Sequence, residues 1–290
     1  KVENLAWDQD RISEAVITAE NSDVVILCVG LDETLEGEEG DTGNSDASGD
    51  KVDLHLPKVQ EELIEKVTAV GKPTIVVLMA GSAIDLNYAQ DNCNGILLAW
   101  YPGARGGRAI ADLLFGKESP SGKLPITFYK DLEGMPEFTD YSMKNRTYRY
   151  MEKEALYPFG YGLTYSDTCV TEAEVVSEVS AESDIMLKAT VKNNGTVDTD
   201  EVVQVYIKDL DSPLAVRNYS LCGFKRVSLK AGEEKTVEFT ISNKAMNIVD
   251  EDGNRYIAGK HFRLFAGVSQ PDTRSAELTG HKPAEVEIAL

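Results

Sequence analysis

The stretch between Asp32 and Asp53 gathers side chains that are suited to acid–base chemistry. It contains one base, Lys51, and nine acidic residues, which are Asp32, Glu33, Glu36, Glu38, Glu39, Asp41, Asp46, Asp50 and Asp53. Carboxylates that crowd together repel one another's charge, and this raises the pKa of at least one of them. A carboxylic acid that keeps its proton near neutral pH can act as a general acid. The stretch is therefore a candidate catalytic loop.

Composition alone leaves two other interpretations of this acidic stretch open. Charged side chains in a loop are mostly solvated and need no further role. A calcium-binding loop is also rich in carboxylates, but the series Asp41, Asn44, Asp46 and Asp50 does not follow the EF-hand spacing. A solvated acidic loop and a calcium loop thus stand beside the catalytic interpretation.

The other candidate motifs favour structural roles. Residues 101–107 resemble a plain strand-to-helix turn, because they match neither of the common phosphate-binding patterns. Ser82 lies outside a GxSxG motif, and the three histidines are scattered, so we expect no catalytic triad, no metal site and no cofactor. The aromatic residues of 148–150 and 157–162 could stack on sugars, although we expect most of them to serve in packing between domains.

The elements around the acidic stretch predict where it lies. Residues 9–20 have the apolar period of a helix, and residues 23–30 form a continuous apolar run that ends in glycine. Such a run is typical of a buried parallel strand, and we expect Cys28 within it to be buried. Open α/β sheets bind ligands at the carboxyl ends of their strands, and loops of this length are usually functional. The acidic stretch therefore begins at the carboxyl end of a predicted strand, which is where a ligand site is expected.

The first half of the chain continues as alternating helices and strands. Helices are expected from Pro57, near 83–90 and over 107–115, and strands over 73–79 and 95–100. This alternation predicts an α/β fold, with a mostly parallel sheet and helices on both faces. We assign residues 1–166 to this domain and regard 116–166 as a linker-like region.

The second half changes to the two-residue period of half-buried strands. Strands are expected over 185–191, 202–207, 235–241 and 261–266, with turns between them. This pattern predicts an antiparallel, all-β sandwich over residues 167–290.

The charge and the cysteines exclude several classes of partner. A net charge of −20 argues against binding to nucleic acid or to anionic membranes, and it is compatible with a neutral sugar. The four cysteines are far apart without CxxC spacing, which favours the cytoplasm and leaves secretion or a periplasmic location open. The first residue is Lys1 rather than Met, which suggests that the native start lies elsewhere.

A set of short motifs follows one order over nearly the whole chain. Its members are 30–39, 53–57 with Gln60, 99–103, 106–116, 120–128, 148–150, 157–165, 192–195 and 201–206. Together they resemble glycoside hydrolase family 3, and specifically its C-terminal α/β sandwich domain followed by a fibronectin type III-like domain.

The resemblance implies retaining hydrolysis of β-linked sugars, most readily β-glucosides, by two carboxylates. The nucleophilic Asp of the family lies on a barrel domain, and the acid/base Glu commonly lies three residues before an Asp. That spacing selects Glu38 before Asp41, with Glu39 and Glu36 as rivals because the run Glu-Gly-Glu-Glu-Gly departs from the commoner Glu-x-Glu-Gly. Asp41 is expected to bind substrate, and Thr42 stands where the family usually has an Arg.

The resemblance also implies that part of the enzyme is missing from this chain. No segment resembles the TIM-type barrel domain, and the α/β domain is expected to be incomplete at its N-terminal side. The expected partners are therefore a β-glycoside and a barrel domain, supplied by the rest of the polypeptide or by a second chain. Alone, the chain is expected to be inactive. The alternative is a non-catalytic carbohydrate-binding or structural module.

Overall fold

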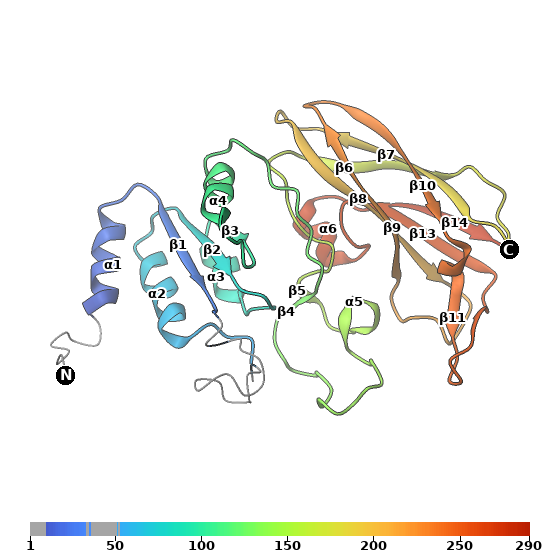
Figure 1. Ribbon diagram of the computed structural model, residues 1–290, viewed down its shortest axis with the longest axis horizontal. Helices are drawn as coiled ribbons and strands as arrows, with labels where there is room; N and C mark the ends of the chain where they lie inside the picture. Colours follow the sequence, from blue (N-terminus) through green and yellow to red (C-terminus); the bar gives the residue numbers. More distant parts are fainter. Residues whose placement is uncertain (1–9, 33–34, 36–50, 52) are drawn as a thin grey trace. The chain divides into compact units, whose positions relative to one another are not determined.

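The computed structural model describes residues 10–32, 35, 51 and 53–290 (Figure 1). They divide into two compact units, and each is described by itself below. The parallel unit comprises the described residues of 1–111 together with 129–132, and the sandwich unit comprises 112–128 and 133–290. The chain passes from one unit to the other three times. The boundary between 166 and 167 that the sequence suggests is a different division and stays a prediction.

The parallel unit is built on three strands, β1 (Val25–Gly30), β2 (Thr74–Met79) and β3 (Gly95–Leu98), in the order β1-β2-β3. Both pairings are parallel, with Val25 opposite Thr74 and Ile75 opposite Gly95. The central strand is the most apolar, and three of its residues in succession are fully buried, namely Val76, Val77 and Leu78. The three strands expected from the sequence are present and pair in parallel, whereas a mostly parallel fold with a helical cover on both faces stays a prediction.

Four helices belong wholly or partly to this unit. They are α1 (Asp10–Glu20), α2 (Lys58–Thr68), α3 (Asn87–Asn92) and α4 (Gly106–Leu114), and the division between the units passes through α4. Helix α2 buries Ile64 and Val67, which are two positions of its apolar face. Three helices agree closely with the ranges expected from the sequence, whereas α3 begins at Asn87 rather than near residue 83.

The exposure of side chains on strand β1 differs from the burial that the sequence predicts for Cys28. Leu27 and Val29 are buried, but the alternate residue Ile26 is 44% exposed and Cys28 is also exposed. Among the described strands β1 is an edge of the sheet, and successive side chains of a strand point to opposite faces. The prediction that Cys28 is buried is wrong, because no described element covers its face of β1.

The core of the sandwich unit lies between two larger antiparallel sheets (Figure 1). One has the order β10-β7-β6, and the other has the order β14-β13-β8-β9. Their bounds are β6 Thr168–Val175, β7 Ile185–Asn193, β8 Thr199–Asp209, β9 Ser220–Leu229, β10 Glu234–Ile241, β13 His261–Gly267 and β14 Ala284–Ala289. The four strands expected from the sequence are confirmed as parts of β7, β8, β10 and β13. Alternate residues of β7, from Ile185 to Val191, are buried in the core between the sheets.

Short elements complete the fold. They are β4 (Phe128–Tyr129), α5 (Thr147–Tyr150), β5 (Ala155–Tyr157), η1 (Asn243–Met246), β11 (Asn247–Val249), β12 (Arg255–Ile257) and α6 (Thr273–Thr279). None of the helices in the described part of the chain combines the length and the apolar character that a membrane span requires.

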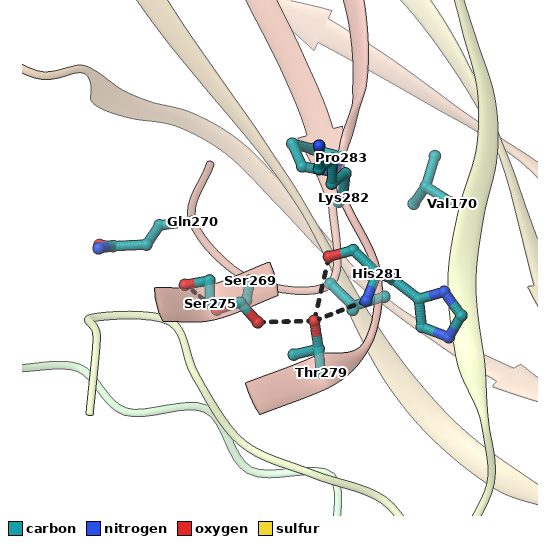
Figure 2. A pocket seen from close by; sticks show the side chains of 10 residues that line it. Val170, Ser269, Gln270, Ser275, Thr279, His281, Lys282 and Pro283 are labelled. Carbon is teal, nitrogen blue, oxygen red and sulfur yellow. Dashed lines mark hydrogen bonds between the residues drawn. The ribbon is translucent and has the colours of Figure 1, made fainter. Parts of the chain in front are cut away.

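A small hollow lies beside the last turn of α6 (Figure 2). The Thr279 hydroxyl on its wall donates to the carbonyl oxygens of Ser275 (2.7 Å) and His281 (3.1 Å) and accepts from the His281 amide (3.3 Å). The hydroxyl of Ser269 donates to that of Ser275 at 3.1 Å. These groups form hydrogen bonds with one another and fix the end of α6. The polar groups on the wall of the hollow therefore have a structural role.

Candidate active-site loop and its anchors

The four site residues predicted from the sequence, Glu38, Glu39, Glu36 and Asp41, lie outside the described residues. What the structure does describe is how the chain enters and leaves the stretch that carries them. We call residues 31–56 the acidic loop. It follows β1 directly and precedes α2. It therefore begins at the carboxyl end of a parallel strand, where ligands of open α/β sheets commonly bind.

The start of the acidic loop is held by Gln60, in the first turn of α2. Its side-chain oxygen accepts from the Gly30 amide at 2.8 Å, and its side-chain nitrogen donates to the Gly30 carbonyl at 2.8 Å. The next amide, that of Leu31, donates to the carbonyl of Met79 at the end of β2, also at 2.8 Å. Both backbone groups of the last strand residue are thus satisfied by one side chain, and the exit direction of the loop is fixed.

Gly30 is required for this exit because of its close approach to β2. A Cβ atom added at Gly30 would lie 1.8 Å from the carbonyl oxygen of Met79. That oxygen is the one that accepts from Leu31, so it cannot move away without loss of the hydrogen bond. Any other residue at position 30 would separate the ends of β1 and β2.

The end of the acidic loop is anchored to the segment that follows β2. The Leu54 carbonyl accepts from the amide of Asp85 at 2.7 Å, and Lys51 Nζ donates to the carbonyl of Ala83 at 3.0 Å. Leu56 is buried, with 4% of its surface exposed. Since β2 also receives the Leu31 amide, the start of the loop is attached to the end of this strand and the end of the loop to the segment that follows it.

Two further residues lie near this edge of the parallel unit. His55 Nδ1 lies 2.8 Å from Glu61 Oε1, and this hydrogen bond, reinforced by the negative charges of Glu61, Asp53 and Asp85, raises the pKa of His55 above its ordinary value while burial opposes the rise. Trp100 follows β3 and has a left-handed backbone, with φ of 52°. A bulky residue in this conformation is strained, and such strain is often found at functional sites.

Replacing Gln60 by Leu is expected to destabilise the parallel unit by about 1–3 kcal/mol, because the amide and the carbonyl of Gly30 would both lose their partner. The measurement is the free energy of unfolding in urea. Glu65→Gln, at an exposed position of the same helix, is the matched control and is expected to change little. Equal stability of the two variants would mean that the contacts to Gly30 do not hold the loop.

The aromatic motifs after residue 147 make contacts within the sandwich unit. The ring of Tyr148 stacks on Phe159 with centroids 4.4 Å apart and 11° between the planes, and its hydroxyl accepts from the Leu221 amide at 3.0 Å. Tyr157 stacks on Tyr161 with centroids 5.6 Å apart. Rings that stack on one another in this way present little face to a ligand, so packing accounts for these motifs.

Three of the resembling motifs meet at β8 in a buried polar cluster. Lys123 Nζ lies 2.8 Å from Glu201 Oε1, and the two side chains are 9% and 2% exposed. Lys123 also donates to the carbonyl of Gly162 at 2.6 Å, and the Thr168 hydroxyl donates to Glu201 Oε2 at 2.6 Å. A buried ion pair is tolerated when further hydrogen bonds satisfy its remaining polar atoms, as they do here.

Gln204 extends this cluster toward the segment 157–162. Its side-chain nitrogen donates to the carbonyls of Gly160 (2.8 Å) and Val268 (3.1 Å), and its oxygen accepts from the Tyr206 hydroxyl at 2.6 Å. Gly160 has a φ of 77°, and a Cβ there would lie 2.2 Å from the Gln204 oxygen. From the sequence we noted these residues only through the resemblance. The sequence signal that could have pointed to them is a polar residue at a buried position of an otherwise apolar strand.

No metal centre is apparent in the described part of the chain, since no three His, Cys, Asp or Glu side chains come together there in a suitable arrangement. Because the acidic residues between 36 and 50 lie outside it, the calcium interpretation of the loop is not tested.

Comparison with known proteins places these features in a family. The chain is 39% identical over 270 residues to a xylan 1,4-β-xylosidase of Xylanibacter ruminicola, covering 92% of this chain and 31% of that protein. It is 33% identical over 284 residues to a β-glucosidase of Bacteroides ovatus, covering 90% and 36%. The chain thus spans about a third of the length of the curated relatives that it matches.

Solved structures of β-glucosidases are also similar to this chain. The family 3 β-glucosidase of Bifidobacterium adolescentis superposes with a TM-score of 0.82 at 29% identity, covering all of this chain and 42% of that one. A β-glucosidase of Erythrobacter marinus gives a TM-score of 0.81 at 32% identity, covering 96% and 36%.

Two family models also match. Residues 201–270 match the fibronectin type III-like domain. Residues 1–165 match the C-terminal domain of glycosyl hydrolase family 3, which is more than half of the chain. The chain belongs to glycosyl hydrolase family 3.

Proposed function

We propose that this chain supplies the general acid/base of a retaining β-glycosidase, with Glu38 in that role and Asp41 as a substrate contact. The observation that carries the proposal is the acidic loop itself. It concentrates carboxylates immediately after β1. Its start is held by Gln60 of α2 and by Met79 of β2, and its end is held by Asp85 in the segment that follows β2. A loop fixed at its ends can present a carboxyl group at a defined place, as proton transfer requires.

The reaction needs a second carboxylate, which we propose to be an Asp on a barrel domain outside this chain. Glu38 protonates the glycosidic oxygen as the bond to the anomeric carbon breaks, and the Asp forms a bond to that carbon. Glu38, now ionised, takes a proton from water, which attacks the anomeric carbon and releases the Asp. In retaining enzymes the two carboxyl groups lie roughly 5–5.5 Å apart, so the loop would have to reach the barrel. No cofactor is needed.

The names of the relatives support β-xylosides and β-glucosides as substrates to test. The complete protein, expressed from its full-length gene, is expected to hydrolyse p-nitrophenyl β-xyloside or β-glucoside and to release the β-anomer of the sugar first, as followed by proton NMR. The 290-residue chain alone is expected to be inactive on the same substrates. Initial release of the α-anomer would contradict retention, and turnover by the isolated chain would contradict the need for a barrel nucleophile.

A further inference from the structure

A braced loop of the sandwich unit exposes two aromatic rings. Phe138 and Tyr141 are each 85% exposed, more than any other large apolar side chain among the described residues. They lie three positions apart in the segment 134–146, which we call the aromatic loop and which appears in Figure 1 as the green excursion before α5. Within the described residues the Tyr141 hydroxyl makes no hydrogen bond.

The aromatic loop is held in shape by side chains at its own end. Arg146 Nη2 donates to the carbonyls of Glu137 (2.8 Å), Asp140 (3.2 Å) and Pro136 (3.4 Å). The Asn145 side chain donates to the carbonyl of Gly134 at 3.4 Å. Compact surface loops that are closed by their own side chains are frequently functional. The two rings are therefore carried on a preformed support and do not have to be ordered by a ligand.

The backbone of this loop is strained over a short stretch. Met143 and Asn145 in the loop, and Thr147 directly after it, have left-handed backbones, with φ of 64°, 58° and 54°. Residues other than glycine adopt this conformation at a cost, which persists where the surroundings impose it and often marks a ligand-binding region. The side-chain oxygen of Asn145 is also buried without a hydrogen-bond partner among the described residues.

The side chains around the two rings indicate what could bind. Every flanking residue from 137 to 142 carries a carboxylate or a hydroxyl, namely Glu137, Thr139, Asp140 and Ser142. The Ser142 amide donates to Asp140 Oδ1 at 2.8 Å, and this bond lowers the pKa of Asp140, so that its carboxylate is a charged acceptor. Flat rings that alternate with oxygen acceptors suit a ligand with apolar faces and many hydroxyl groups. An aliphatic protein surface would leave those acceptors without partners.

We propose that the aromatic loop binds a neutral oligosaccharide, with Phe138 and Tyr141 stacking on the faces of its sugar rings. The choice of a sugar rests on the proposed function, and the net charge of −20 disfavours an anionic ligand. The surface lies on the described part of the sandwich unit and does not include the acidic loop. Binding there can thus be measured without hydrolysis.

The test is titration of the 290-residue chain with xylohexaose and with cellohexaose, followed by NMR shifts of the protein. Wild-type protein is expected to bind at least one of them, and the double variant Phe138→Ala/Tyr141→Ala is expected to bind it at least about tenfold more weakly. Phe224→Ala is the matched control, since Phe224 is a 66% exposed ring on β9 of the same unit and is expected to leave the affinity unchanged.

A second variant tests the support rather than the rings. Arg146→Leu removes the bonds to three carbonyls but keeps both aromatic residues, and it is expected to weaken binding while the sandwich stays folded by circular dichroism. Unchanged affinity in the double variant, or no binding by the wild type, would overturn the proposal. A shift in self-association in place of sugar binding would overturn it in favour of a protein contact. Because no turnover is measured, failure here is distinct from failure of Glu38 as the acid/base.

Discussion

Replacing Glu38 by Gln in the complete protein is expected to lower kcat for xylobiose or cellobiose by roughly 10²–10⁴, the usual contribution of general acid–base catalysis. Gln has nearly the shape of Glu but cannot deliver a proton to the leaving oxygen. The loss in kcat/KM, which reports the first step, is expected to be much smaller for aryl glycosides with good leaving groups, because these need little protonation to depart. Their kcat is expected to stay low, because the second step still lacks its general base. The measurement is kcat and kcat/KM over a series of leaving groups for the wild type and the variant.

Glu36→Gln and Glu39→Gln are the matched controls, since they change the same group one or two positions away. Azide separates the two steps of the reaction. It carries its own negative charge, needs no general base, and can attack the glycosyl-enzyme at the anomeric carbon, so that the Asp leaves and a β-glycosyl azide forms. We expect azide to restore turnover of an activated aryl glycoside by Glu38→Gln alone. If the Glu39 or Glu36 variant instead lost turnover and azide restored it, the acid/base role would belong to that residue.

Replacing Lys123 by Met is expected to destabilise the sandwich unit by about 3–5 kcal/mol, because it leaves a buried carboxylate without its partner. Glu201 is only 2% exposed and cannot turn to solvent without disrupting β8. The measurement is the free energy of unfolding in urea.

The sandwich offers its own control for this effect. Lys188 lies 3.5 Å from Glu238, and the side chains of this pair are 38% and 61% exposed. Lys188→Met removes the same charge from a solvated pair, and it is expected to cost less than about 1 kcal/mol. In the double variant Lys123→Met/Glu201→Gln much of the lost stability should return, because no charge remains buried. Equal costs for Lys123→Met and Lys188→Met would mean that burial of the pair is not what matters.

The elements that could be predicted from the sequence are those whose burial follows a simple period. Strand β2 is apolar from Ile75 to Met79 and β7 alternates along its whole length, and both were expected within a residue or two. Strand β9 was missed because it is an edge strand and most of its residues are at least partly exposed. Helix α6 is short, and its limits are set by Asp272, which accepts from the Ser275 amide, and by left-handed Gly280.

The candidate site was predictable only in part. The density of carboxylates and the position after β1 can be read from the chain. The Gln60–Gly30 contact cannot, because it joins residues that are brought together only when α2 folds back on β1. The exposure of Cys28 depends in the same way on which strands flank β1, and a local pattern does not contain that information.

The threefold passage of the chain between its two units has a consequence for synthesis on the ribosome. The parallel unit includes residues 129–132 and closes through Asn87, whose side chain donates to the Lys130 carbonyl at 2.7 Å. By the time these residues emerge, the first segment of the sandwich unit, 112–128, has already left the exit tunnel. Ser119 in that segment bonds to Thr199, which is 80 residues further along. At about 5–20 residues per second this partner follows roughly 4–16 s later, so the segment can pair with residues 160–165 before β6 is made but must wait for β8 to complete its contacts.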